Sequence, residues 1–492
     1  MCDIAKQVAD LSPEKRALLM RRLQVSRPKE VHIAQTEQEL IIGTVPLLPR
    51  QRWFFERNIP DPHQWNIVEL LEVHQDLDPT LIEQITYHLL AHHDALRLRF
   101  VHEESVWRQF ITGSDVASFT SINLSMLTET AQGAAIKAIG MELQSTLNLF
   151  DGPVARVALF DLGPYRPKRL LVIIHHLVSD GVSLRILLED FWTAYQQLSH
   201  GKAIRLPPKT TSIKYYAERL TEHAQSEALQ TEKAFWLSKS RGEVASLPMD
   251  YPENIELATI ATSHHLLTYL SVEETWALVH RVPRICGAQV VEILLTALAQ
   301  ILVRWTGTHS MLIELTSHGR DIIFDDVDIS RTIGWLTNHS QVFLELDEIL
   351  GPKEALHTVT EQLRQMPNKG TGYDLLRHLS NDAVLVSQLR SFPESEVFFN
   401  YAGQQSQGIG SSKSSLFQSA GVSWELASPA YLQTRRPKLL VLWISINAGQ
   451  LRIDWDYSKR IYRRSTIEYL ATAFLDEIRL FIEGVASTVR EF

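Results

Sequence analysis

The chain has 492 residues, of which 45% are hydrophobic and 21% are charged, and its net charge is −9 with neutral histidines. This length exceeds the size at which a single hydrophobic core stops growing, so we expect two domains or two large lobes. The acidic balance argues against nucleic acid as the main partner, because phosphate binding requires a concentrated basic surface. No apolar run is long enough to span a bilayer, and no apolar segment of signal-peptide length opens the chain. We therefore expect a cytoplasmic protein without a membrane partner.

The two cysteines, Cys2 and Cys286, lie far apart, and neither has a partner at metal-binding spacing. Such usage predicts no disulfide framework and fits a reducing compartment. No motif of zinc-binding type accompanies them, so we predict no metal site.

The first predicted element is a short amphipathic helix at residues 11–19. Ser12 is a suitable N-cap, Pro13 suits the first helical position, and leucines follow. A polar stretch at residues 24–38 then indicates a linker. Two interpretations stay open for this region: an arm that packs on the domain, or a connector from a carrier domain.

Hydrophobic periodicity predicts alternating helices and strands in the rest of the chain. In the first half, we expect helices at residues 81–93 and 183–198 and from residue 213, and strands at residues 96–100, 155–160 and 170–174. In the second half, we expect helices at residues 271–286, 290–305, 354–366 and 466–483, strands at residues 311–315, 396–399, 439–447 and 451–455, and a loop at residues 406–419. Helices and strands are mixed in both halves, which predicts an α/β or α+β protein with two lobes.

Two adjacent histidines, His175 and His176, end a strand-like apolar run and precede a helix. The end of a strand in a strand–loop–helix unit is a common place for catalytic groups. Histidine is also a natural general base near neutral pH. Because neighbouring strand residues point to opposite faces, only one of the two can face a given substrate. A metal half-site and a hydrogen-bonded core pair are the alternatives.

Asp180 and Gly181 follow the histidine pair in the same segment. We expect Asp180 to have a structural role, paired with an arginine such as Arg97 or Arg99. Gly181 would allow a tight backbone bend before the helix.

The segment from residue 175 to residue 181, HHLVSDG, resembles the HHxxxDG motif of the condensation superfamily of nonribosomal peptide synthetases. That superfamily includes condensation, cyclization and epimerization domains and chloramphenicol-acetyltransferase-like enzymes. Further segments resemble epimerization-domain motifs in the same order, at residues 50–56, 64–66, 292–298, 318–321, 330–337, 369–373 and 399–403. The chain is therefore identified as a member of this superfamily, similar above all to its epimerization branch.

This resemblance implies two chloramphenicol-acetyltransferase-like lobes that form a V with a central tunnel, as a monomeric pseudo-dimer. We expect an N-terminal helix and linker at residues 1–40, one lobe at residues 41–210 and the other at residues 211–492. The tunnel would admit the 4'-phosphopantetheine arm of a peptidyl carrier protein, which carries the substrate, and neighbouring synthetase domains would be the other partners. No cofactor would be bound by the domain itself.

The implied reaction converts the α-carbon of an aminoacyl or peptidyl thioester from L to D, with His176 as the general base. A second acid/base group must act on the opposite side, and the glutamate usual there is replaced by Thr316. The catalytic candidates are His176, His175, Asp180, Gly181 and Glu314, and the substrate-binding candidates are Thr316, His318, Asn400 and Tyr401. Glu314 or His318 could stand in for the missing glutamate.

Three further residues depart from the family pattern. Arg50 replaces an isoleucine, Leu184 a tryptophan and Asp374 a glycine. Because the second acid/base group is in question, two other functions stay open. One is a condensation-type acyltransferase that forms an amide or ester bond, and the other is a catalytically silent scaffold that binds a carrier protein.

Overall fold

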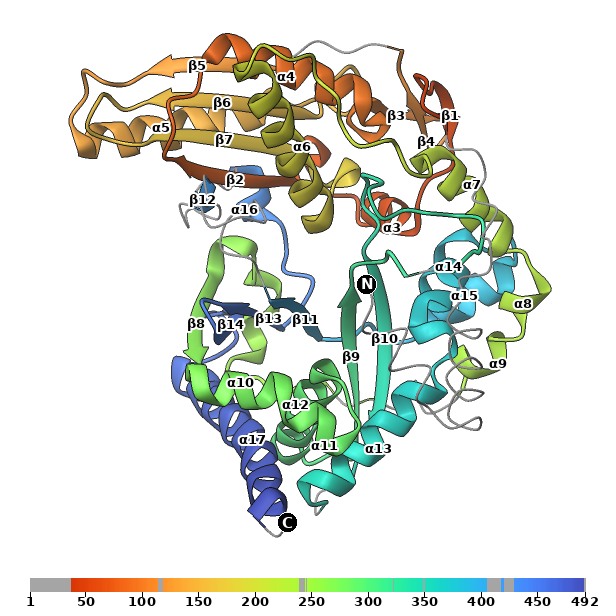
Figure 1. The fold of residues 1–492 in the computed structure, drawn as a ribbon. Helices are drawn as coiled ribbons and strands as arrows, with labels where there is room; N and C mark the ends of the chain where they lie inside the picture. Colours follow the sequence, from red (N-terminus) through yellow and green to blue (C-terminus); the bar gives the residue numbers. More distant parts are fainter. Residues whose placement is uncertain are drawn as a thin grey trace, which may run out of the picture.

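The computed structural model describes residues 37–113, 118–238, 244, 246–321, 323–347, 350–404, 417–419 and 429–490. The helix predicted at residues 11–19, nearly all of the predicted linker and most of the predicted loop at residues 406–419 lie outside these ranges. Helices and strands alternate in two lobes, as predicted, and both lobes appear in Figure 1.

The N-terminal lobe is built on a five-stranded sheet with the order β12-β2-β7-β6-β5. Its strands are β2 (Asn66–Val73), β5 (Phe119–Asn123), β6 (Ala155–Asp161), β7 (Lys168–His175) and β12 (Phe417–Ser419). Helices α4 (Pro79–His92) and α6 (Gly181–Ser199) lie on one face, and α5 (Glu129–Ser145) lies on the other (Figure 1). Beside them is a small sheet of β1 (Gly43–Val45), β4 (Val106–Ile111) and β3 (Leu98–Glu103).

The C-terminal lobe is built on a six-stranded sheet with the order β10-β9-β11-β13-β14-β8. Its strands are β8 (Ser263–Tyr269), β9 (Ser310–Ser317), β10 (Asn338–Glu345), β11 (Val397–Gln404), β13 (Leu440–Asn447) and β14 (Gln450–Ser458). Four helices pack on one face: α10 (Val272–His280), α12 (Val290–Thr306), α13 (Pro352–Gln365) and α17 (Arg464–Arg490) (Figure 1). Their apolar sides form the core of this lobe.

Among the described residues, the other face of the six-stranded sheet carries no such helix layer, and we call it the helix-free face. Strand alternation separates the two faces, since successive side chains point in opposite directions. On β13, Leu442 and Ile444 are buried in the core, whereas Trp443 between them is 46% exposed. The helix-free face includes Glu314, Thr316, His339, Gln341, Asn400 and Trp443.

The two lobes are joined by more than the chain connection. β12, from the second half of the sequence, pairs antiparallel with β2 of the N-terminal sheet. Tyr431 of α16 (Pro429–Gln433) contacts Trp65 edge-on, with the ring centroids 5.1 Å apart. On the opposite side, α3 (Pro49–Glu56) packs on α14 (Thr371–Leu379). One continuous hydrophobic cluster consequently extends through both lobes. The division of the chain at residues 40 and 210 stays a prediction.

Most predicted elements are present, with two informative differences. The helix expected at residues 271–286 is split into α10 and α11 (Val282–Cys286), because Pro283 lacks the backbone donor that a continuous helix requires. The strand expected from residue 96 begins at Leu98, because the preceding residues form a 3-10 turn that Arg97 holds through bonds to the Leu90 and Ile41 carbonyl groups.

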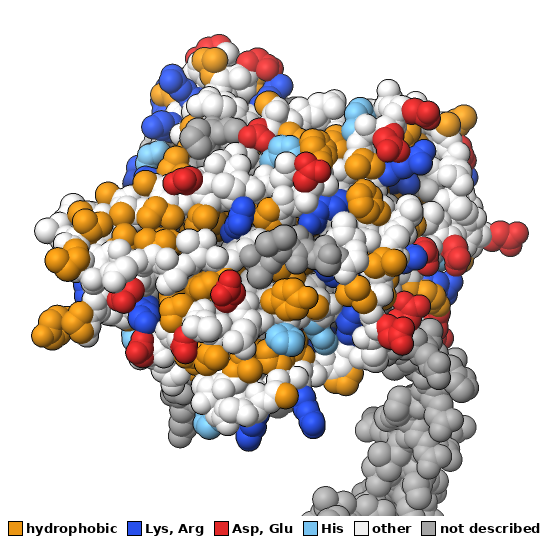
Figure 2. Space-filling model, turned by 90° about the horizontal axis from the view of Figure 1, so that it is seen from above, with side chains coloured by type: hydrophobic (Ala, Val, Ile, Leu, Met, Phe, Trp, Pro, Cys, Tyr) orange, Lys and Arg blue, Asp and Glu red, His pale blue; other side chains and the backbone are white. Residues whose placement is uncertain are grey.

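Among the described residues, no single helix has both the length and the apolar character to cross a membrane. The helices Val272–Cys286 and Val290–Thr306 meet those criteria only as a pair, which is bent by 94°. Seen from above, Lys and Arg side chains are interspersed with Asp and Glu over the described part of the surface (Figure 2).

Candidate active site

The histidine pair lies where β7 passes into α6. His175 is the last residue of β7, His176 opens a 3-10 turn that ends at Val178, and Asp180 is the N-cap of α6. Only His175 thus belongs to the strand, so the alternation expected for two strand residues does not apply to the pair.

His175 is buried, and both of its ring nitrogens are occupied. Nε2 donates to the Pro62 carbonyl oxygen at 2.7 Å, and Nδ1 accepts from the Leu177 N–H at 3.1 Å. Burial lowers the pKa of His175 to about 3, so its imidazole is neutral at ordinary pH. With no nitrogen available to a substrate, His175 positions the turn rather than exchanging protons.

His176 differs in each of these respects. Its ring lies 4.3 Å from that of Trp335, centroid to centroid, and the residue is only partly buried. Its Nδ1 is buried, and the nearby backbone of His176 and Ser179 favours the charged form. Among the described residues, no hydrogen bond engages Nε2, and this nitrogen is not among the fully buried unpaired atoms, so Nε2 is the nitrogen available to a substrate. Burial lowers the pKa of His176 while Asp180 opposes that shift. The neutral ring therefore has the protonation state that a general base needs.

Asp180 connects the two lobes at this point. Arg320 donates to both of its carboxylate oxygens, at 2.9 and 3.1 Å, while the backbone N–H groups of Ser183 and Leu336 donate at 2.8 and 3.1 Å. Asp180 is fully buried. The structural role predicted for it agrees with this geometry, but the predicted partner was wrong. Arg97 pairs with Asp94 instead.

Arg99, the other arginine considered for Asp180, donates to the Leu98 carbonyl oxygen, and the arginine on the Asp180 carboxylate is Arg320. Of the two glycines near Arg320 and Asp180, only Gly319 has a backbone position that requires glycine. Gly319 has a φ of +64°, and a Cβ there would overlap the Leu336 carbonyl oxygen. Gly181 opens α6 with φ outside the left-handed region, and an added Cβ would meet nothing within 4 Å. The backbone bend predicted at Gly181 thus does not require glycine.

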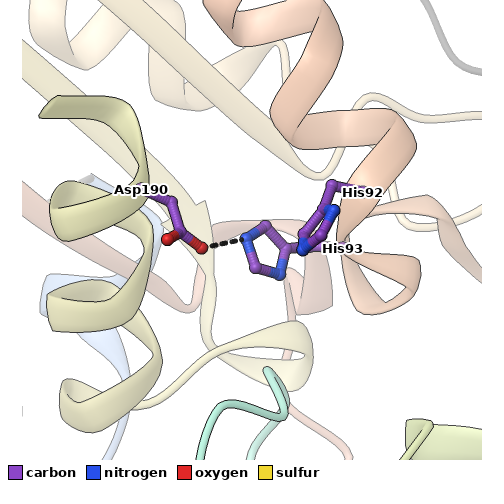
Figure 3. A group of neighbouring side chains, drawn as sticks. All are labelled: His92, His93 and Asp190. Carbon is purple, nitrogen blue, oxygen red and sulfur yellow. Dashed lines mark hydrogen bonds and ion pairs between the residues drawn. The ribbon is translucent and has the colours of Figure 1, made fainter. Parts of the chain in front are cut away.

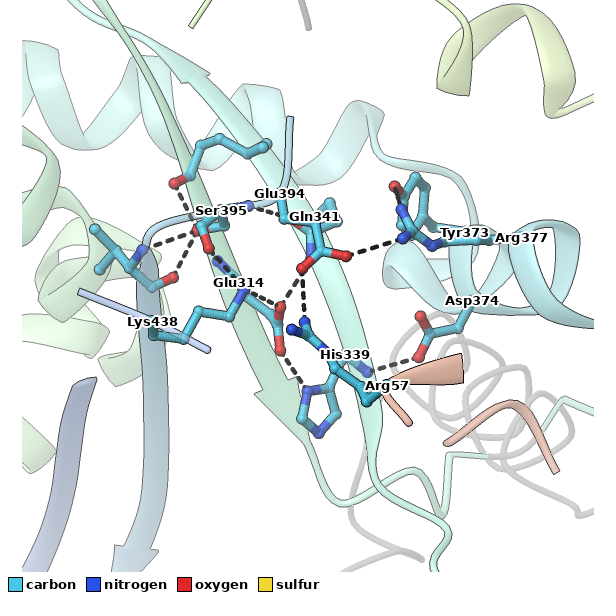
Figure 4. Close-up of polar contacts among 12 residues, drawn as sticks. Arg57, Glu314, His339, Gln341, Tyr373, Asp374, Arg377, Glu394, Ser395 and Lys438 are labelled. Carbon is cyan, nitrogen blue, oxygen red and sulfur yellow. Dashed lines mark hydrogen bonds and ion pairs between the residues drawn. The ribbon is translucent and has the colours of Figure 1, made fainter. Parts of the chain in front are cut away.

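Glu314 lies buried on the helix-free face, within the polar network of Figure 4. Its Oε1 is 2.6 Å from His339 Nδ1, and its Oε2 is 2.6 Å from Lys438 Nζ and 3.0 Å from Gln341 Nε2. Lys438 and His339 hold the pKa of Glu314 well below its usual range despite burial. Glu314 is therefore a fixed carboxylate whose oxygens are both occupied.

The four predicted substrate-binding residues separate into two groups. Thr316 and Asn400 are neighbours on adjacent strands of the helix-free face, and Thr316 Oγ1 is buried without a hydrogen-bond partner among the described residues. Tyr401 instead packs against the core on the other face. His318 is exposed, and its Nδ1 accepts from the Arg320 backbone N–H at 3.0 Å. Only Thr316 and Asn400 face the site.

Two of the departures from the family pattern lie together beside this network. The Arg50 guanidinium is buried and lies 3.9 Å from the Asp374 carboxylate. Asp374 accepts a hydrogen bond from the His339 backbone N–H at 3.4 Å. Arg50 also lowers the pKa of His339. The third departure, Leu184, packs partly buried against the core. His339 and Lys438 were not among the predicted site residues, because no local motif marks them.

A second histidine cluster, drawn in Figure 3, has the composition of a metal site. The ligand atoms of His92, His93 and Asp190 lie within 4.8 Å of one another. Both oxygens of Asp190 are already occupied, one by His93 Nε2 at 3.0 Å and the other by Arg331 at 2.6 Å. An arginine on this carboxylate opposes a cation there, so the cluster anchors the 331 segment to α6.

Comparison with known proteins places the chain in a family. A family model described as "Condensation domain" matches residues 41–492. A linear gramicidin synthase of Brevibacillus parabrevis is 42% identical over 91% of the chain, and chondramide synthase cmdD of Chondromyces crocatus is 37% identical over 90%. The chain spans only 6% and 11% of the lengths of these proteins.

Among solved structures, the epimerization domain from the third module of tyrocidine synthetase B superposes with a TM-score of 0.83. It is 33% identical, and the match covers 92% of this chain and 100% of that domain. The histidine motif, the two lobes with chloramphenicol-acetyltransferase-like folds and these matches together show that the chain belongs to the condensation-domain family of nonribosomal peptide synthetases.

Proposed function

We propose that the chain epimerizes the α-carbon of an aminoacyl or peptidyl thioester, with His176 as the general base. The observation that carries this proposal is the state of His176: the residue is partly exposed beside Trp335, and among the described residues no hydrogen bond engages its Nε2, which is not among the fully buried unpaired atoms. Burial lowers its pKa, which favours the neutral ring. The likeness to the tyrocidine epimerization domain along nearly the whole chain supports it.

The reaction requires proton transfer but no redox chemistry. The Cα–H bond breaks, its proton passes to the imidazole, and the electron pair delocalises into the thioester carbonyl as an enolate. A proton delivered to the opposite side of Cα restores the thioester with inverted configuration. The unpaired hydroxyl of Thr316 is suited to donate to the enolate oxygen, where negative charge develops. Asp180 favours the imidazolium that forms on His176.

The substrate would arrive on the 4'-phosphopantetheine arm of a peptidyl carrier protein. The relatives are long synthetases of which this chain matches a small part, which supports neighbouring carrier and synthetase domains as partners. At Gly181, space is open beside the first turn of α6, and a flexible arm could pass close to the backbone there.

A second function, acyl transfer to an amine or alcohol, is favoured by one observation. Thr316 cannot exchange protons at a useful pKa, whereas bond formation needs only one histidine to position or deprotonate the acceptor. The two functions differ in the fate of the α-proton, because acyl transfer leaves it in place.

The test is α-proton exchange in deuterium oxide, followed by chiral analysis. The whole chain is incubated with aminoacyl and dipeptidyl pantetheine thioesters that cover the chiral proteinogenic amino acids. We expect deuterium incorporation with inversion for at least one thioester, and a loss of about 100-fold or more in His176→Asn. His280→Asn, an exposed histidine on α10, is the control. No exchange across the panel would overturn the proposal, and amide formation with added amines would favour the second function.

A further inference from the structure

We propose that His339, oriented by Glu314, is the second acid/base group of the site and faces the α-carbon opposite His176. This assignment rests on the proposed epimerization and names the group that the reaction still lacks. It follows from the placement of His339, from its free nitrogen and from its neighbours.

The placement of His339 comes from the pairing of β9 and β10. His339 lies directly opposite Thr316 in this antiparallel pair, and both residues belong to the helix-free face. Side chains directly opposite in such a pair have their Cβ atoms about 5 Å apart. The imidazole of His339 can therefore act close to the position of Thr316, where the usual acid/base glutamate is missing.

His339 and His176 belong to one site. A short chain of contacts connects them. The His176 ring lies 4.3 Å from that of Trp335, and the Arg50 guanidinium lies 5.7 Å from the same Trp335 ring. Arg50 is in turn 3.9 Å from the Asp374 carboxylate, which accepts from the His339 backbone N–H at 3.4 Å. The two histidines come from different lobes, His176 from the end of β7 and His339 from β10. Two proton-transfer groups on separate walls are the arrangement that inversion at one carbon requires.

The tautomer of His339 is determined by its partner. Because Glu314 is ionised, its oxygen can only accept, so the 2.6 Å contact requires that Nδ1 of the imidazole carry the proton. The lone pair of the neutral ring is then on Nε2. Within the described parts of the chain, no hydrogen bond engages Nε2, and this nitrogen is not among the fully buried unpaired atoms. Nε2 is therefore available to a substrate.

Glu314 is held so that it can orient the ring. Lys438 and Gln341 bind its other oxygen, and Lys438 also donates to the Ser395 carbonyl oxygen at 2.6 Å (Figure 4). A carboxylate on one imidazole nitrogen fixes the ring orientation and stabilises the imidazolium during proton transfer. Glu314 is thus a positioning residue.

The charges that face His339 have opposing effects on its protonation. Burial and the positive charge of Arg50 lower its pKa, while Glu314 and Asp374 raise it. On balance the pKa of His339 is lowered, so its ring is neutral at rest and acts as a proton donor only after it has taken up a proton.

Each step of this reaction balances. In one direction, neutral His176 removes the α-proton and protonated His339 supplies a new proton to the opposite side of Cα. In the other direction, the two histidines exchange roles. Solvent then restores both protonation states, and no oxidant or reductant takes part.

The test uses the whole chain and both enantiomers of a reactive pantetheine thioester in deuterium oxide. In His339→Asn, we expect inversion to fall about 100-fold or more. In this variant, exchange of the α-proton should persist for the enantiomer that His176 deprotonates, and the product should keep its configuration. Exchange should be lost for the other enantiomer. His176→Asn should show the reverse pattern. His378→Asn is the matched control, because His378 is also a buried histidine that contacts a glutamate.

A second measurement protects the test against misfolding of the His339 variant. Glu314→Gln should move the acid limb of the His339-dependent exchange to lower pH, and Arg50→Met should move it to higher pH, because these changes remove opposite charges beside the ring. Unchanged limbs in both variants, or inversion by a folded His339→Asn within about threefold of the parent chain, would overturn the assignment. If the parent chain exchanges no α-proton, the proposed function itself fails.

Discussion

Two identical side chains next to each other in sequence have different chemical roles here, and their hydrogen bonds explain the difference. His175 has both nitrogens bound by backbone groups and is neutral because it is buried. Among the described residues, no hydrogen bond engages Nε2 of His176, this nitrogen is not fully buried, and the ring lies against Trp335. A histidine becomes a proton carrier only where one nitrogen stays accessible, so the local backbone selects which member of the pair can act.

The neutral state of His175 predicts a pH-dependent stability. Its folded pKa is about 3, far below the value of 6.5 for a free histidine, so only the unfolded chain takes up this proton between those values. The free energy of unfolding should therefore fall by about 1.4 kcal/mol per pH unit from this residue as the pH drops below 6.5. Urea unfolding at several pH values measures the slope.

The comparison variant for this measurement is His175→Asn, whose side-chain oxygen can still accept from the Leu177 N–H. The free energy of unfolding of this variant should change less with pH than that of the parent chain, and the difference between the two slopes should correspond to about one proton. A variant of exposed His280 should keep the parent slope. Equal slopes in the parent chain and in His175→Asn would contradict a buried neutral imidazole.

At the scale of elements, sequence patterns predicted what is local and failed where distant segments meet. Periodicity predicted α6 and α12, because each has an apolar side of helical spacing. The arginine partner of Asp180 was predicted wrongly, because Arg320 lies 140 residues away and meets α6 only through tertiary packing. His339 was missed for a similar reason, since a cross-strand neighbour of Thr316 has no sequence signal of its own.

The connection between α6 and the end of β9 should be sensitive to loss of its ion pair. Asp180→Ala removes the N-cap of α6 and leaves the buried Arg320 guanidinium without its carboxylate. Breaking one partner of a buried pair costs about 3–5 kcal/mol, so we expect a loss of that size in urea or thermal unfolding. Glu361→Ala, which breaks an exposed pair with Arg364, should cost much less. Similar losses in both variants would contradict this account.

At the scale of the molecule, the lobes resemble two halves of one folding unit more than two independent domains. A single hydrophobic cluster runs from Ile41 in the first half to Phe481 in α17. β12 completes the N-terminal sheet from the second half of the chain, and Arg52 of α3 donates to the His378 carbonyl oxygen of α14 at 3.0 Å. Each lobe thus depends on chain segments from the other, which fits a catalytic site assembled from both walls.

This shared core predicts that both lobes unfold in one transition. Hydrogen exchange at increasing urea concentration should show β6 and β7 losing protection at the same midpoint as β13 and β14. Ile173→Ala provides the decisive variant, because Ile173 is fully buried in the separate cluster between the N-terminal sheet and α5, away from the second lobe. Such a truncation costs about 2–5 kcal/mol. If the lobes are coupled, Ile173→Ala lowers the urea midpoint at which β13 and β14 lose protection as much as the midpoint for β6 and β7. An unchanged midpoint for β13 and β14 would show that the lobes unfold independently.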